Sequence, residues 1–228
     1  MKNKNIFLIM TIIVMIFECY NSEISVTTNK VGDIDGYTYE FWKEEGTGYM
    51  NLLGGGSCFC RWFFEKDAIF RIGKRLDSPK LWNEFGNFTV KYNADYSPTC
   101  NSYLSIYGRN KKLYNDFYIV ENWGASSPSG EYHIGSIWLD GDYYDMYMTP
   151  RIKALIPPVP GGYCYYEQLW SVRRNKRTEG TDNVRKHMEE WSKQGLNFGI
   201  IDEVFLSIEV HDKNVGHSYI YETNITVG

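Results

Sequence analysis

Val204-Phe-Leu-Ser-Ile-Glu-Val-His211 alternates aliphatic residues with larger or more polar ones along its whole length. Successive side chains of a strand point to opposite faces, so residues two apart share a face. The even-numbered positions from Val204 to Val210 are all aliphatic, whereas Glu209 lies on the other face with His211. A strand with one apolar and one mixed face is typical of a sheet that covers a core on one side only.

Leu113-Tyr-Asn-Asp-Phe-Tyr-Ile-Val-Glu-Asn-Trp-Gly124 places a second carboxylate inside an aromatic, strand-like run. Asp116 shares its strand face with Tyr118. Hydrolysis of a glycosidic bond needs two carboxyl groups that face each other across it. Asp116 and Glu209 are therefore candidate catalytic residues. The alternative is that each acid is an ordinary solvated residue on the wetter face of its strand.

Strand-like segments recur along the chain, with Gly, Asn, Asp or Pro between them. We expect strands at Tyr37–Trp42, Tyr49–Leu53, Phe59–Phe63, Ala68–Ile72, Asn87–Tyr92, Ser102–Tyr107, Asp116–Asn122, His133–Leu139, Asp142–Thr149, Tyr163–Val172, Val204–His211 and Ser218–Ile225. This many strands in one domain predict an all-β fold, a two-sheet β-jelly roll sandwich. The proline-rich segment Lys153–Gly162 is expected to be a stiff loop, either a plain connection or a lid.

One segment has helical periodicity instead. It opens with Thr181 and Asp182 as capping residues and ends at Gly195. The apolar positions at helical spacing are Val184, His187, Met188 and Trp191. We therefore expect a single amphipathic α-helix, with His187 as a packed core residue and not as a ligand.

The first 22 residues are expected to be a secretory signal peptide, because Lys2 and Lys4 precede the short apolar run Ile6–Phe17. That run is too short for a spanning helix, and an uncleaved anchor is the alternative. Residues 23–228 are then a single secreted, extracellular domain, with no membrane association after signal removal.

Composition excludes some partners and leaves others open. The net charge is −4, which provides no basic stripe for nucleic acid. Aromatic residues make up 17% of the chain, and an excess of Tyr and Trp suits either a surface that stacks on sugars or an all-β core.

The four cysteines beyond residue 22 permit up to two disulfides in an oxidising compartment, and free buried thiols are the alternative. They are Cys58, Cys60, Cys100 and Cys164. Cys58 and Cys60 are two apart and so point the same way on a strand. Their spacing gives no convincing zinc site, and no metal or cofactor is expected.

The motifs, taken in order from about Gly36 to Ile225, resemble the glycoside hydrolase family 11 xylanases. They are Gly36–Lys43, Asn101–Gly108, Tyr118–Gly124, Asp140–Tyr147, Gln168–Thr178, His187–Gly199 and the acid at Glu209. The resemblance implies a jelly roll with one α-helix packed on the outer sheet and a thumb loop over a cleft. It also implies a monomeric, retaining endo-1,4-β-xylanase that cleaves internal bonds of xylan or arabinoxylan without a cofactor.

The resemblance also implies residue roles. Glu209 matches the family's acid/base, and Asp116 matches its nucleophile, which is normally a glutamate. The substrate-binding positions match Trp42, Tyr103, Tyr107, Tyr118, Arg151, Gln168 and Trp170.

Four departures from the family pattern bear on activity. The nucleophile is shorter by one methylene, Arg109 replaces a tryptophan, Val210-His211 replaces Gly-Tyr, and the thumb residues 156–161 are rewritten. Three alternatives follow: a slow retaining xylanase, an enzyme whose strand has shifted to compensate, or a xylan-binding pseudoenzyme. A host-interaction protein that borrows the fold has only the thumb in its favour.

Overall fold

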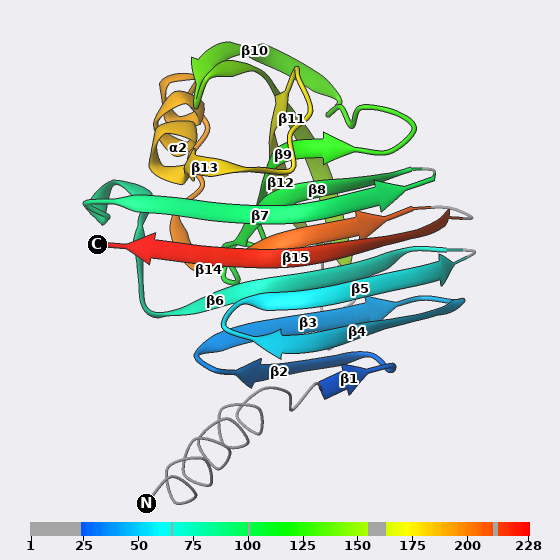
Figure 1. Cartoon of the computed structure of the whole chain (residues 1–228). Coiled ribbons are helices and arrows are strands. Elements are labelled where there is room, and N and C mark those ends of the chain that lie inside the picture. Colours follow the sequence, from blue (N-terminus) through cyan, green and yellow to red (C-terminus); the bar gives the residue numbers. More distant parts are fainter. Residues whose placement is uncertain (1–23, 65, 100, 155–162, 212–213) are drawn as a thin grey trace, which may run out of the picture.

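Two β-sheets and one α-helix make up the part of the chain that the computed structural model describes, residues 24–64, 66–99, 101–154, 163–211 and 214–228 (Figure 1). The expected signal peptide and most of the expected thumb lie outside these residues. Within them, no helix combines the length and the hydropathy that a membrane crossing requires.

The smaller sheet has six strands. Their order across the sheet is β1 (Ile24–Val26), β4 (Thr47–Gly54), β5 (Ser57–Phe64), β15 (Asn214–Val227), β7 (Phe88–Pro98) and β13 (Glu179–Asn183). All of its pairings are antiparallel.

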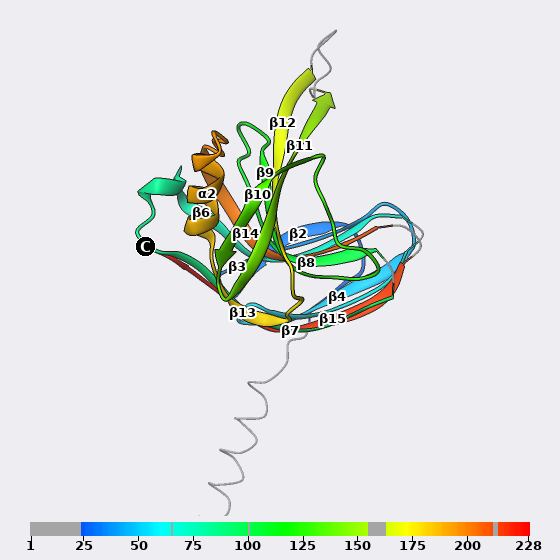
Figure 2. The ribbon, with the colours of Figure 1, turned by 90° about the horizontal axis from the view of Figure 1, so that it is seen from above.

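The larger sheet has nine strands. Their order is β10 (Tyr132–Leu139), β11 (Asp142–Ala154), β12 (Tyr163–Arg173), β9 (Asp116–Trp123), β8 (Ser102–Arg109), β14 (Ile200–Val210), β6 (Ala68–Leu81), β3 (Tyr37–Lys43) and β2 (Lys30–Ile34). Only β12 and β9 pair in parallel among the described strands. Figure 2 shows the two layers, with the β11–β12 end of the larger sheet bending away from the smaller one.

This arrangement confirms the predicted jelly roll. Each of the twelve predicted strands is present, and the prediction missed three short ones, β1, β2 and β13. Residues of β8 alternate between two faces as those of a strand do: Leu104 and Ile106 are fully buried in the core, whereas Tyr107 belongs to a separate buried cluster. One face of the larger sheet therefore covers the core and leaves the other face for a site.

The prediction was wrong about where the helix begins. Helix α2 spans Val184–Lys193, and its N-cap is Asn183, whose side chain accepts the backbone N–H of Lys186. Thr181 and Asp182 lie in β13 and pair with β7. Pairing with a neighbouring strand, which is a tertiary interaction, overrides the local capping signal there. His187 is fully buried, as predicted.

The cysteines in the core are free thiols. Cys58 and Cys60 are fully buried, with their sulfur atoms 3.8 Å apart, so they do point the same way. Cys164 is also free, and Cys100 lies outside the described residues.

A buried ion network lies between the two sheets, on the core-facing side of β9. Arg177 donates to both Glu121 and Asp182. The hydroxyls of Tyr92 and Tyr144 also donate to Glu121, at 3.0 and 2.7 Å. Glu121 thus lies on the face of β9 opposite to Asp116, which the odd spacing of the two residues predicts.

Candidate active site

The two candidate acids lie on the outward face of the nine-stranded sheet, above a floor of aromatic side chains. Tyr118 and Trp170 stack with ring centres 4.1 Å apart, and Tyr107 packs against Tyr118 at 5.2 Å. Phe205 completes the same buried cluster. Strand pairing fixes this floor, because Trp170 pairs with Tyr118 and Tyr118 with Tyr107.

Asp116 is held at one oxygen. The Tyr107 hydroxyl donates to Oδ1 at 2.6 Å, and Arg109 Nε donates to the same atom at 3.3 Å. The side chain is only 13% exposed, and burial raises the pKa of Asp116 although the Tyr107 hydrogen bond and the two nearby arginines lower it. The charge of Glu209 adds to the rise in the pKa of Asp116.

Glu209 is held at both oxygens. Arg71 Nη2 donates to Oε1 at 2.5 Å, and the Tyr103 hydroxyl donates to Oε2 at 3.3 Å. Tyr103 in turn contacts His211 Nε2 at 2.7 Å. A hydrogen-bonded chain therefore runs from Glu209 through Tyr103 to His211, and on to Asp67, which lies 3.1 Å from His211 Nδ1.

Arg71 is one of the residues that the sequence analysis missed. Its side chain is 2% exposed, and besides Glu209 it donates to Glu40 at 3.1 Å and to Ser207 at 3.2 Å. Its guanidinium carbon lies 3.6 Å from the centre of the Tyr107 ring. The signal was a charged residue inside the apolar strand Ala68–Ile72, where a buried arginine implies a buried carboxylate partner.

Tyr107 and Arg71 connect the two acids. The Tyr107 hydroxyl donates a hydrogen bond to Asp116, and the Arg71 guanidinium makes a cation–π contact with the Tyr107 ring. Arg71 in turn donates a hydrogen bond to Glu209. Asp116 and Glu209 therefore belong to one continuous network on one face of the sheet. Their role as a pair of catalytic carboxylates stays a prediction.

A second charged group borders Asp116. Glu203 is 4% exposed at its side chain and lies 3.3 Å from Arg109 Nη1 and 2.8 Å from Lys111 Nζ. A pocket of about 560 Å³ opens beside Asp116, and this volume is ample for sugar residues. Its lining residues are Arg109, Lys111, Tyr114, Asp116, Ile152 and Tyr166.

The remaining predicted binding residues are Gln168, Arg151 and Trp42. Gln168 pairs with Asp116 across β12 and β9, and its side chain accepts Arg151 Nε at 2.8 Å. Trp42 is 37% exposed. It lies in the same cross-strand row as Glu209, because both residues pair with Ile69 of β6. Trp42 makes no described contact with Asp116 or Glu209.

Comparison with known proteins agrees with this geometry. The model of the family described as glycosyl hydrolases family 11 matches residues 34–220. Endo-1,4-beta-xylanase A of Thermoclostridium stercorarium is 38% identical over 200 residues, which are 88% of this chain and 30% of that protein. The bifunctional xylanase/deacetylase of Pseudobutyrivibrio xylanivorans is 38% identical over 90% of this chain and 33% of its own length. The chain thus spans about a third of the length of these relatives.

Two further relatives match over most of their own length. Endo-1,4-beta-xylanase A of Bacillus pumilus is 35% identical over 90% of this chain and 87% of that protein. The solved family 11 xylanase from Neocallimastix patriciarum superposes with a TM-score of 0.80 at 26% identity, covering 90% of this chain and all of that one. The chain therefore belongs to glycoside hydrolase family 11.

Proposed function

We propose that the chain is a secreted endo-1,4-β-xylanase that cleaves internal bonds of xylan with retention of configuration. The observation that carries the proposal is the network in which Tyr107 and Arg71 join Asp116 to Glu209. The named activity of the relatives supports the substrate, xylan or arabinoxylan. The apolar run that follows Lys2 and Lys4 supports export.

In this proposal Asp116 is the nucleophile. Tyr107 and Arg109 both bond to Oδ1, so Oδ2 attacks the anomeric carbon. Because burial raises the pKa of Asp116, the attacking carboxylate becomes protonated at a higher pH than an exposed aspartate does. Asp116 therefore sets the acidic limit of activity.

Glu209 is the general acid and then the general base. A guanidinium only donates hydrogen bonds, so the oxygen bonded to Arg71 cannot carry the acid proton, which must sit on Oε2. Glu209 gives this proton to the glycosidic oxygen as Asp116 forms the covalent glycosyl-enzyme. It then takes a proton from the water that attacks the anomeric carbon and releases Asp116, which restores the original configuration.

The short nucleophile slows the first step. An aspartate carboxylate lies about 1.5 Å, one C–C bond, further back than that of a glutamate. A displacement of about 1 Å can cost about a hundredfold in rate. Arg109 and Tyr107 hold Asp116 in a fixed position but cannot restore its length.

A second candidate function is a xylan-binding cleft without turnover, and the contact of Arg71 with Glu209 favours it. An ion pair with a buried arginine stabilises a carboxylate, whereas the first step needs a carboxylic acid. Calorimetric titration with xylohexaose distinguishes the two functions. Binding heat without any release of shorter xylo-oligosaccharides would support the binding protein.

Incubation of the purified chain with arabinoxylan is expected to release reducing ends steadily. A matched Glu209→Gln variant keeps the shape of the side chain but loses the acid, and we expect its rate to fall by about two to four orders of magnitude. Equal release by the two proteins would show that Glu209 is not the acid. No release by either would remove the xylanase proposal and leave the binding cleft.

Substitution Asp116→Glu is expected to raise kcat/KM on xylo-oligosaccharides by about one to three orders of magnitude, because it returns the carboxylate to attack distance. Asp116→Asn is the matched control, and it should abolish turnover since an amide cannot form the glycosyl-enzyme. Activity of Asp116→Asn equal to that of the parent would place the nucleophile elsewhere. Slower turnover of Asp116→Glu would mean that the strand has adapted to the shorter acid.

Substitution Tyr107→Phe is expected to move the acidic limb of the kcat/KM profile to higher pH. The Tyr107 hydroxyl stabilises the ionised form of Asp116, so its removal raises the pKa of Asp116 further. Activity depends on the ionised form and is therefore lost sooner as the pH falls. Tyr221→Phe, at an exposed site on β15, is the control and should leave the limb in place. An acidic limb that moves to lower pH in Tyr107→Phe would contradict the assignment.

A further inference from the structure

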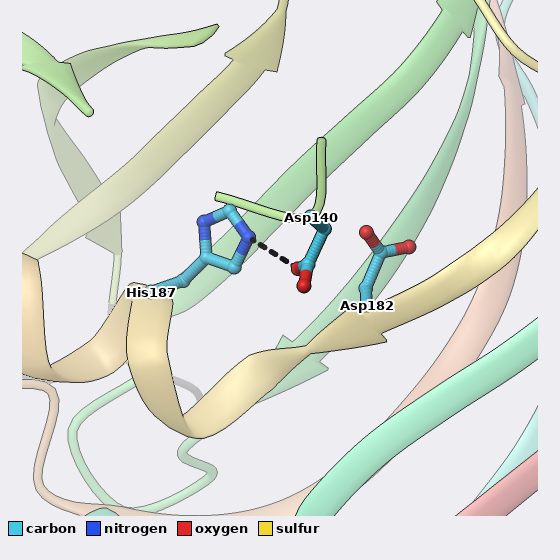
Figure 3. A group of neighbouring side chains, drawn as sticks. All are labelled: Asp140, Asp182 and His187. Atoms are coloured by element: carbon cyan, nitrogen blue, oxygen red, sulfur yellow. Dashed lines mark ion pairs between the residues drawn. The ribbon is translucent and has the colours of Figure 1, made fainter. Parts of the chain in front are cut away.

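Three potential metal ligands converge on the side of the nine-stranded sheet opposite to the cleft (Figure 3). Asp140 comes from the turn between β10 and β11, Asp182 from β13 and His187 from α2. One ligand atom from each of the three side chains can be chosen so that all lie within 4.8 Å of one another. The site is outside the catalytic network, because Ser171, which contacts His187, neighbours Trp170 on β12 and points to the other face.

Two polar atoms of these side chains are buried without a hydrogen bond, although His187 Nε2 lies within ion-pair range of Asp140 (Figure 3). Asp182 Oδ2 and His187 Nε2 have no hydrogen-bond partner among the described residues, and both side chains are fully buried. His187 Nε2 lies 3.8 Å from Asp140 Oδ2, too far for a hydrogen bond. Two metal–ligand bonds of about 2.1 Å span such a distance at an obtuse angle, and because they reach at most about 4.2 Å, ligand atoms as far apart as 4.8 Å would have to move together on binding. Polar atoms this deeply buried normally have a partner.

Neighbouring contacts fix the ligands in orientation. His187 Nδ1 lies 2.8 Å from the Ser171 hydroxyl, which directs Nε2 towards the two acids. Metal-binding histidines usually engage an oxygen through their second nitrogen in this way. Asp182 is held through its other oxygen, Oδ1, by Arg177 and by the Tyr144 hydroxyl at 3.2 Å. Asp140 Oδ2 accepts the backbone N–H of Asn183 at 3.0 Å.

The local charge favours a divalent cation. Glu121, Asp140 and Asp182 share one cation, Arg177, which ion-pairs with Glu121 and Asp182. The other nearby arginine, Arg173, is paired with Asp142 at 3.4 Å. With all three carboxylates ionised and the imidazole neutral, two negative charges would be in excess, and a divalent ion would balance them. A buried excess of this size is costly unless it is paired or coordinates a metal.

We propose that Asp140, Asp182 and His187 bind a divalent transition-metal ion of the zinc class. One imidazole and two carboxylates suit Zn²⁺ better than Ca²⁺, which prefers six to eight oxygen ligands. The ion joins the continuous β13–α2 segment to the β10–β11 turn, which this segment also contacts through the hydrogen bond from the Asn183 backbone N–H to Asp140. Its role is structural, and it gives His187 a function beyond the core packing that the sequence predicts.

The test titrates Zn²⁺ into the full chain after treatment with a chelator. We expect one equivalent to bind by calorimetry, and the melting temperature to rise by about 5–10 °C at a hundredfold excess of metal over Kd. Asp140→Asn should abolish both effects. Asparagine keeps the turn and the hydrogen bond from Asn183, so this variant is expected to fold. Asp145→Asn, on the same hairpin with an exposed ion pair to Arg174, is the matched control and should bind as the parent does.

Replacement of Zn²⁺ by Co²⁺ gives a second readout, because a histidine–carboxylate site produces visible absorption bands that His187→Gln should remove. Absence of stoichiometric binding by the parent chain would overturn the proposal and leave a water-filled polar site. Binding that survives unchanged in both Asp140→Asn and His187→Gln would also overturn it, since the ion would then lie at one of the other histidines.

Discussion

The outward face of the nine-stranded sheet depends on one buried guanidinium. Arg71 is almost completely enclosed, yet it bonds Glu209, Glu40 and Ser207 and lies over the ring of Tyr107. Two carboxylates packed among aromatic rings would be too costly to bury without such a cation. In the proposed mechanism the contact also assigns one oxygen of Glu209 to the ion pair and leaves the other for the proton.

The nucleophile side of the cleft follows the same physical rule with different residues. Asp116 is shorter than the family's glutamate, and Arg109, which stands where the family has tryptophan, bonds both Asp116 and Glu203. The shortened acid and the new arginine therefore form one linked change. In the proposed function, this change exchanges the sugar-stacking surface that the resemblance implies for a charged one, which fixes Asp116 but leaves it further from the substrate.

The fold was largely predictable because its information is local. Alternation along β8 and β14 assigns each residue to the core or to the cleft, and the structure follows it at Leu104, Tyr107 and Phe205. The start of α2 was not predictable, because pairing of β13 with β7 overrides the cap at Thr181. The sequence analysis missed Arg71 and Glu203 for a related reason, which is that their ion-pair partners come from other strands. Arg71, for example, pairs with Glu209, which lies 138 residues further along the chain. Only strand register brings such residues together.

The central claim is that Asp116 attacks the anomeric carbon, and trapping the intermediate tests it most directly. A 2-deoxy-2-fluoro-xylobioside with a dinitrophenolate leaving group slows release of the glycosyl-enzyme and needs no proton from Glu209. Mass spectrometry of the digested protein should then locate one glycosyl adduct on the peptide that contains Asp116. An adduct on Glu209, on Glu203 or on any other carboxylate, or no adduct at all, would contradict the account.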